Sequence, residues 1–514
     1  MKYCIWFPAV QWQKSLTRTQ HSPTLSLVCI CPLNFCNMHD RSHALLVSPP
    51  LFGHIIPLLE LGKKLMDHGY FVTMVLSKSK VNQLYQRELI PDRFQPVLRL
   101  VGITDKNDAE YEIADYNIAY RMEPLLVSVC RALIAESTRR NDLLGLIEQG
   151  DVNVLAPNIS AADGEKPNIA HVDLRITVII TDFCLTAPIQ VGHSHNIPSY
   201  MFSAFSASLL RHMLVVTKDT PVCKDAVDYA DRIRPIDLAT NLPMMTESTK
   251  NFILRINDAV PLTSGFLVNS FREFDPEAVD NLETKLTSWN VPLKFVGPLL
   301  AVTQTDFSPA TRMLVQWLDE QPLRSVIYVS FGSMVVLPDE QVIEIATALM
   351  AHGSPAIWSL REQQQNLLPP EINTKIEKLA HQPGGVIVSP WVPQRTVLGH
   401  PATGAMITHC GWNGTLESIF YGIPTLVWPI MDDQPVNAES AVQNRLSVQI
   451  SPVHFTNPSA IVPAAEIQQK LTELKNEKFL MAAKHWAEVS HGAVSSGGSS
   501  YQEFHKTFVM HDLL

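Results

Sequence analysis

The segment Ala405-Met-Ile-Thr-His-Cys-Gly-Trp-Asn-Gly-Thr-Leu-Glu-Ser-Ile-Phe-Tyr421 decides the fold class. Its first four residues predict a buried strand, and the glycine-bearing stretch His409 to Gly414 predicts a turn. Residues 415–421 have helical character until Gly422 and Pro424 stop it. Unpaired backbone N–H groups and the positive end of a helix dipole meet at such a junction, so it predicts a phosphate site.

The same alternation of strand and helix extends outward in both directions. Apolar, β-rich runs predict strands at residues 44–48, 70–76, 177–181, 199–203, 265–269, 325–331, 356–360, 385–389 and 424–428. Uninterrupted runs of this kind are typical of parallel sheets covered on both faces. Residues 151–175 hold Pro157, Gly164 and Pro167 and predict a surface loop.

A chain of 514 residues is too long for one hydrophobic core, and two α/β domains account for it best. Apolar periodicity lapses after Gly297 and Pro298. The predicted organisation is an N-terminal extension at 1–39, a first α/β domain at 40–298, a linker at 299–312, a second α/β domain at 313–490, and a C-terminal segment at 491–514 that packs back on the first domain.

The first 39 residues contain no Asp or Glu and include a short apolar run at 25–33. A secretory signal would place that run closer to the start, and a transit peptide would carry more Arg and Ser. We therefore expect an unstructured upstream extension, with the functional chain beginning near Met38.

Composition excludes several classes of protein. With 46% hydrophobic and 18% charged residues the chain is expected to fold, and its net charge of −10 gives no attraction for nucleic acid or anionic lipid. No apolar run is long enough to span a bilayer. The eight cysteines do not form a disulfide framework, and Cys29-Ile-Cys31 lacks the second ligand pair of a zinc site. We expect a cytoplasmic monomer.

A longer segment, Trp391 to Gln434, reads WVPQRTVLGHPATGAMITHCGWNGTLESIFYGIPTLVWPIMDDQ. It resembles the donor-binding signature of plant-type UDP-glycosyltransferases, in the family 1 glycosyltransferases, with no insertion or deletion. Further landmarks stand in family order, among them Ser325-Val-Ile-Tyr-Val-Ser-Phe-Gly-Ser333 and Gly497-Gly-Ser-Ser-Tyr501. The resemblance covers residues 41–507 and implies a GT-B fold, in which two Rossmann-like α/β domains face each other across a cleft.

The resemblance also implies a role for each residue of the donor site. Trp391 would stack on uracil, with Val392 and Gln394 beside the base and ribose, and Glu417 would accept from both ribose hydroxyls. Ser333, His409 and Asn413, with the backbone at Gly411, would bind the diphosphate and offset its charge. Trp412, Asp433 and Gln434 would contact the sugar, and the final Gln resembles glucose-using members.

Gly414 departs from the family, which usually has Ser at this position. A hydroxyl for the phosphate is lost, while the backbone N–H remains and Thr415 lies next to it. The resemblance therefore leaves two outcomes open, weaker donor binding or compensation by Thr415.

Two residues of the first domain complete the expected site. Gly53-His54-Ile-Ile-Pro57 resembles the catalytic-histidine motif of the family, and Asp182 matches its aspartate. His54 would take the proton of the acceptor, Asp182 would fix the imidazole, and UDP would leave with inversion. We expect no cofactor and no metal, since the donor segment has no DxD-like motif.

Three other functions compete with this interpretation. They are another nucleotide-sugar enzyme on the same scaffold, such as an epimerase or a sterol-type transferase, a non-catalytic UDP-sugar-binding protein, and an NAD-dependent oxidoreductase. The last lacks GxGxxG after the first strand. The acceptor cannot be identified, although Met122, Phe202, Phe205 and Leu209 would suit either a lipophilic pocket or a plain core.

Overall fold

The structure is a computed structural model. It describes residues 42–87, 89–103, 116–136, 152–155, 175–222, 246–300, 308–379, 385–451 and 460–510. The predicted extension at 1–39 lies outside these ranges. Among the described residues, no helix has the length and apolar character needed to cross a membrane.

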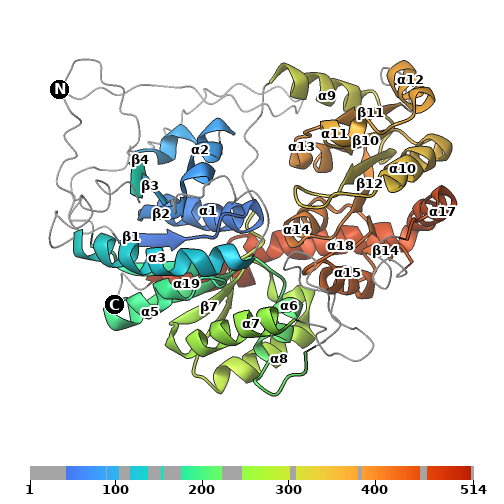
Figure 1. The fold of residues 1–514 in the computed structure, drawn as a ribbon. Helices are drawn as coiled ribbons and strands as arrows, with labels where there is room; N and C mark the ends of the chain where they lie inside the picture. The colour runs from blue at the N-terminus through green and yellow to red at the C-terminus, as the bar shows by residue number, and fades with distance from the viewer. Residues whose placement is uncertain are drawn as a thin grey trace, which may run out of the picture. The chain divides into compact units, whose positions relative to one another are not determined.

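The first sheet has eight strands in the order β4-β3-β2-β1-β5-β6-β7-β8 (Figure 1). All are parallel except β4, which pairs antiparallel with β3. Their bounds are β1 His43–Val47, β2 Phe71–Ser77, β3 Leu98–Ile103, β4 Val152–Leu155, β5 Val178–Asp182, β6 Ser199–Ser203, β7 Gly265–Val268 and β8 Leu293–Phe295. The helices around it are α1 Phe52–Asp67, α2 Lys78–Gln86, α3 Tyr116–Glu136, α5 Ala187–Ser194, α6 Ala207–Leu214, α7 Glu247–Ala259 and α8 Pro276–Thr287.

The second sheet has six parallel strands in the order β11-β10-β9-β12-β13-β14. The strands are β9 Val326–Ser330, β10 Ala356–Ser359, β11 Val386–Ser389, β12 Thr403–Thr408, β13 Thr425–Val427 and β14 Ser447–Gln449. Its helices are α9 Pro309–Asp319, α10 Asp339–His352, α11 Glu362–Gln365, α12 Pro370–Leu379, α13 Gln394–Leu398, α14 Trp412–Tyr421, α15 Gln434–Gln443 and α17 Ala464–Leu474.

Both sheets are buried on their two faces, as their apolar strands predict. In β1, Leu45 and Val47 belong to one hydrophobic cluster, whereas Ala44 and Leu46 belong to another. Because neighbouring side chains in a strand point to opposite faces, this division shows a core on each side of the sheet. The expected fold class, two Rossmann-like domains, is confirmed.

The last two described helices pack against different domains. Helix α18 (Glu477–Val494) packs on α14 (Figure 1). Helix α19 (Ser499–Phe508) packs against β8. Phe504 and Phe508 of α19 lie in the same hydrophobic cluster as Leu46. Tyr70 donates a hydrogen bond to the Phe508 carbonyl at 2.7 Å, so the C-terminal helix is tied to the first sheet.

Three predicted boundaries were wrong. Residues 152–155 of the predicted 151–175 loop form strand β4, because a short run with two valines pairs with the exposed edge of β3. Helix α9 begins at Pro309, inside the predicted linker, with the Ser308 side chain as its N-cap. Helix α14 begins at Trp412 rather than at residue 415, because Gly411 serves as the N-cap residue.

Candidate functional site

His54 and Asp182 lie at the point where the strand order of the first sheet reverses. Strand β1 pairs with β2 on one side and with β5 on the other. His54 is in the first turn of α1, which follows β1, and Asp182 is the last residue of β5. Ligands of open parallel sheets bind beyond the carboxyl ends of the strands at such a switch point. The topology therefore brings together two residues 128 positions apart.

The two side chains form a buried hydrogen-bonded pair. His54 Nδ1 lies 2.8 Å from Asp182 Oδ2, and their side chains are 7% and 0% exposed. The second oxygen of Asp182 accepts from the Cys184 backbone N–H at 3.0 Å. The Phe205 and His54 rings lie in a T-shaped arrangement, with centroids 5.1 Å apart. Since Nδ1 faces the carboxylate, Nε2 is the nitrogen available to take a proton.

Burial and the surrounding acids act on His54 in opposite directions. Burial lowers its pKa, but the Asp182 carboxylate raises it, with help from Asp433 and Asp432, so that the pKa is raised above the ordinary value overall. Two of these acids belong to the second domain. The base therefore responds to charge on the donor side of the molecule as well as to its own partner.

Cys184 is a neighbour of this pair that the sequence analysis missed. Its thiol hydrogen-bonds Asp182, and burial raises the pKa of the thiol well above its usual value. The ligand atoms of His54, Asp182 and Cys184 lie within 4.8 Å of one another, which is close enough to hold a metal ion. A protonated thiol and a carboxylate already bonded to His54 are poorly prepared as ligands, because metal binding requires the deprotonated forms.

The residues expected to bind the diphosphate lie at the matching switch point of the second sheet, between β9 and β12. Ser333 follows β9 and is exposed, whereas His409 follows β12. Gly332 and Gly411 flank the imidazole closely. A Cβ on Gly332 would lie 2.6 Å from His409 Cε1, and one on Gly411 would lie 2.7 Å from Nε2. Both glycines are therefore required for the ring to fit.

Burial lowers the pKa of His409 to about 4, against a small opposite effect of the Ser330 backbone. The imidazole is consequently neutral at physiological pH in the free protein. This modifies the expectation that His409 offsets the charge of a diphosphate. A neutral imidazole contributes a hydrogen-bond donor, and the positive end of α14 remains the source of electrostatic attraction.

The Trp412 side chain does not point toward a bound sugar. It is 3% exposed, packs against Phe274, and donates from Nε1 to the Asn269 carbonyl at 2.7 Å. The indole is therefore turned into the protein, and a contact with sugar hydroxyls through the indole is not supported by this geometry. Its backbone N–H, in the first turn of α14, is engaged as well, because the Asp433 carboxylate accepts from it.

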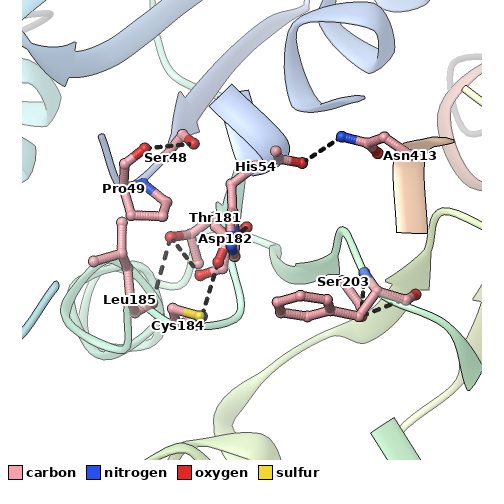
Figure 2. Close-up of polar contacts among 11 residues, drawn as sticks. Ser48, Pro49, His54, Thr181, Asp182, Cys184, Leu185, Ser203 and Asn413 are labelled. Carbon is pink, nitrogen blue, oxygen red and sulfur yellow. Dashed lines mark hydrogen bonds and ion pairs between the residues drawn. The ribbon is translucent and has the colours of Figure 1, made fainter. Parts of the chain in front are cut away.

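Asn413 points the other way, toward the first domain. Its Nδ2 donates to the carbonyl oxygen of Gly53 at 2.9 Å, the residue immediately before His54. Figure 2 shows the amide reaching the start of α1 beside the His54–Asp182 pair. The N-terminus of the donor helix α14 and the N-terminus of the base-bearing helix α1 are thus joined directly.

Asp433 and Gln434 begin helix α15 and are both buried. Burial raises the pKa of Asp433 to about 6, although Asn437, 2.6 Å away, and His54 act to lower it. Gln434 uses its side-chain oxygen to accept from the backbone N–H groups of Ile430 and Met431. The oxygen of Gln434 is therefore part of the turn, and its amide NH₂ is the group left for a ligand.

Among the residues expected around the nucleoside, one side chain is exposed, whereas the others are buried or hydrogen-bonded within the protein. Trp391 is 62% exposed, an unusual state for an indole and one that suits a stacking surface. Val392 is buried in the cluster that holds Trp317, so its side chain cannot contact a base and only its backbone can. Gln394 donates from Nε2 to Glu417 at 2.5 Å, and Glu417 also lies 3.6 Å from Arg395.

Gly414 lies in the first turn of α14 with open space around it. A Cβ there would meet only Gln394 Nε2 at 3.8 Å and Thr408 Oγ1 at 3.9 Å. Thr415 does not replace the missing serine hydroxyl, because it is buried and donates to the Gly411 carbonyl at 3.2 Å. The compensation considered in the sequence analysis is therefore not supported by the geometry.

Of the four residues suggested for an acceptor wall, Phe205 alone contacts the base. Phe202 is fully buried in a cluster on the other face of the first sheet, together with Phe504. Met122 and Leu209 are buried in the core of the face that holds Phe183. For Phe202 the direction of the side chain within β6 decided this outcome, and a single sequence does not show which face of β6 borders the site.

The first switch point holds a histidine bonded to a carboxylate, and the second holds a helix N-terminus beside a histidine packed between two glycines. Together they are typical of a two-domain nucleotide-sugar transferase. A family model described as "UDP-glucoronosyl and UDP-glucosyl transferase" matches residues 196–463. The chain belongs to this family, and it is a UDP-glycosyltransferase. The resemblance and the GT-B fold class expected from the sequence are thereby confirmed.

Relatives support the same conclusion along most of the chain. UDP-glucose flavonoid 3-O-glucosyltransferase 6 of Fragaria ananassa is 30% identical over 359 residues, covering 64% of this chain and 74% of that protein. UDP-glycosyltransferase 71B7 of Arabidopsis thaliana is 32% identical over 367 residues, covering 63% and 72%. Medicago truncatula UGT71G1 complexed with UDP-glucose shares the fold, with a TM-score of 0.71, 22% identity, and coverage of 92% and 98%.

Proposed function

We propose that the enzyme transfers glucose from UDP-glucose to a hydroxyl or carboxyl of a small lipophilic acceptor, with inversion at the anomeric carbon. The observation that carries this proposal is the 2.8 Å contact between His54 Nδ1 and Asp182 Oδ2, which leaves Nε2 as a base. Two relatives carry the name UDP-glucose flavonoid 3-O-glucosyltransferase, and these names favour glucose as the sugar and phenolic acceptors as the first compounds to test.

His54 is the general base in this mechanism, and Asp182 is its positioning residue. A neutral hydroxyl is a weak nucleophile, so removal of its proton as the C–O bond forms lowers the barrier. Asp182 holds the Nδ1 proton and stabilises the imidazolium that results. The acceptor oxygen attacks the anomeric carbon from the face opposite UDP, and the bond to the phosphate oxygen breaks with its electron pair on UDP.

The donor is held by the second domain. We assign uracil stacking to Trp391, the ribose hydroxyls to Glu417, and the diphosphate to the α14 N-terminus with His409, Asn413 and Ser333. The sugar is assigned to Asp433 and the Gln434 amide. The support for these roles is their common position beyond the carboxyl ends of the parallel strands β9, β11, β12 and β13.

We propose further that a monomer performs the reaction in the cytoplasm without a metal ion. The free, buried thiols of Cys130, Cys184 and Cys410 suit a reducing compartment. Full activity after treatment with EDTA and a monomeric mass by light scattering are the expected results. Loss of activity in EDTA that zinc or magnesium restores would contradict the metal-free proposal.

The test of the activity is an assay of UDP release with UDP-glucose, UDP-galactose and UDP-glucuronate against phenolic, terpenoid and carboxylic acceptors. The expected result is acceptor-dependent release with UDP-glucose preferred, and a β-glucoside product by the anomeric coupling in proton NMR. The His54→Ala variant should lose roughly 10²–10⁴-fold in kcat. Undiminished transfer by His54→Ala, or release of free epimerised sugar, would overturn the proposal.

A further inference from the structure

A chain of hydrogen bonds runs through the second domain behind the expected nucleoside site. Tyr328, in the middle of β9, is 1% exposed, and its hydroxyl lies 3.0 Å from Gln394 Oε1. Gln394 Nε2 in turn lies 2.5 Å from Glu417 Oε2 on α14. Three residues from three different elements are thus connected in one line.

Chemistry fixes the direction of this line. Glu417 as a carboxylate can only accept, so the NH₂ of Gln394 must face it and the amide oxygen must face Tyr328. The tyrosine hydroxyl is then the donor. Burial raises the pKa of Tyr328 well above its usual value, so the hydroxyl keeps its proton wherever the enzyme is stable. The orientation of the Gln394 amide is therefore set from both ends.

The line continues on the far side of Tyr328 toward the phosphate loop. The Ser330 side chain hydrogen-bonds the Tyr328 hydroxyl, and the Gly332 N–H approaches Ser330 Oγ at 3.4 Å. Gly332 is the residue that leaves room for the imidazole of His409. The buried hydroxyl of Tyr328 thus connects the loop at Gly332, which is assigned to the diphosphate, with Glu417, which is assigned to the ribose.

Glu417 depends on these contacts for its charge. Burial raises its pKa, whereas the hydrogen bond from Gln394 and the nearby Arg395 lower it. Without a fixed amide, Glu417 loses a donor that holds both its rotamer and its ionised state. Two ribose hydroxyls need two correctly placed acceptor oxygens, so either loss weakens ribose recognition.

We propose that Tyr328 is a positioning residue for ribose recognition, acting on Glu417 through the Gln394 amide without contacting the donor itself. The proposal rests on the assignment of Glu417 to the ribose hydroxyls made above. It predicts that the tyrosine hydroxyl matters for nucleotides that carry those hydroxyls and does not matter for nucleotides that lack them.

The experiment is calorimetric titration of the full chain with UDP and with 2′,3′-dideoxy-UDP. Tyr328→Phe should weaken UDP binding roughly three- to tenfold, the loss of one net hydrogen bond, and leave binding of the dideoxy nucleotide unchanged. In steady-state assays the KM for the donor should rise while kcat stays constant. Tyr70→Phe is the matched control, because it also removes a buried hydroxyl bond, at 2.7 Å, but far from the donor residues. It should bind both nucleotides as the wild type does.

Glu417→Ala separates the proposal from its premise. If this variant loses affinity for UDP and not for the dideoxy nucleotide, Glu417 binds the ribose. An equal effect of Glu417→Ala on both nucleotides would overturn the ribose assignment. It would also overturn the proposed relay, which is the hydrogen-bonded series Tyr328, Gln394 and Glu417. Suppose that Glu417→Ala weakens the binding of UDP and not that of the dideoxy nucleotide. The relay alone is then wrong if Tyr328→Phe binds UDP normally, or if it weakens the binding of both nucleotides alike.

A second variant guards against a Tyr328→Phe protein that does not fold. Gln394→Met removes the middle of the relay at a partly exposed position and should show the same preference for loss with UDP. Where both variants fold, the Tyr328→Phe effect should vanish in the Gln394→Met background, because the hydroxyl then has no amide to orient. Additive effects of the two changes would overturn the relay.

Discussion

Asn413 donates a hydrogen bond to the Gly53 carbonyl, 360 positions earlier in the chain, and so links the donor helix α14 to the helix that bears His54. The acceptor of this bond is the residue directly before the base. The α14 N-terminus and the α1 N-terminus are therefore joined by one hydrogen bond, with no intervening residue. The second N–H of the Asn413 amide can serve a bound donor.

Replacing Asn413 with Ala should weaken donor binding roughly three- to tenfold, since one donor is lost. Asn413→Asp should cost on the order of a hundredfold, because its carboxylate faces both the Gly53 carbonyl and a bound diphosphate. Calorimetry with UDP measures both effects. Asn281→Asp on the exposed face of α8 makes the same charge change and should bind UDP normally. Equal affinities of the Ala and Asp variants would show that Asn413 does not face an anion.

Replacing Asp182 with Asn should change the pH dependence of kcat/KM as well as its size. His54 works as a base only when neutral, so activity rises with pH through its pKa. Asp182 is the main cause that raises this pKa, whereas burial lowers it. In Asp182→Asn the acid limb should therefore move to lower pH, with activity at the plateau reduced roughly 10²–10⁴-fold.

Asp275→Asn is the control for this pH profile. Asp275 caps helix α8, and Asn is an equally good N-cap residue, so the change should leave the acid limb where the wild type has it. An acid limb that stays in place in Asp182→Asn would mean that a group other than His54 controls activity in this pH range.

The sequence predicted the elements of this protein better than it predicted the directions of side chains. Strand and helix alternation is local, so ten strands of the two sheets and the junction at His409 were found from the residues themselves, whereas β3, β4, β8 and β14 were not. His54 and Asp182 each follow a strand, and the family resemblance linked them. Trp412 and Val392 were misjudged because their burial depends on Asn269 and Trp317, which are far away in the chain. Tyr328 gave no signal, since in sequence it is one more residue of an apolar strand.

Replacing Trp412 with Phe tests the correction to its role. The change leaves the Asn269 carbonyl unpaired in a buried interface and should lower the free energy of unfolding by about 1–3 kcal/mol. The ratio of kcat/KM for UDP-glucose over UDP-galactose should stay as in the wild type, because the indole does not face the sugar. Thermal melting and paired donor assays measure the two effects. Asp433→Asn changes a residue assigned to the sugar and should change that ratio. A changed ratio in Trp412→Phe, together with normal thermal melting, would show that the indole does contact the sugar.

Replacing Gly414 with Ser should increase both donor affinity and stability, an uncommon combination for a binding site. The position has helical geometry, and the nearest atoms to a new Cβ lie at 3.8 and 3.9 Å, so the side chain fits without displacement. A serine hydroxyl in the first turn of α14 adds a donor toward the diphosphate and should tighten UDP binding by about two- to tenfold. Removing a helical glycine should also stabilise the fold by about 0.5 kcal/mol, because the unfolded chain loses freedom. Gly492→Ala in α18 is the control, because a Cβ there meets open space. It should stabilise the fold without changing UDP binding. If Gly414→Ser melts higher but binds UDP as the wild type does, a hydroxyl at this position does not reach the diphosphate, and the departure at this position affects only helix stability.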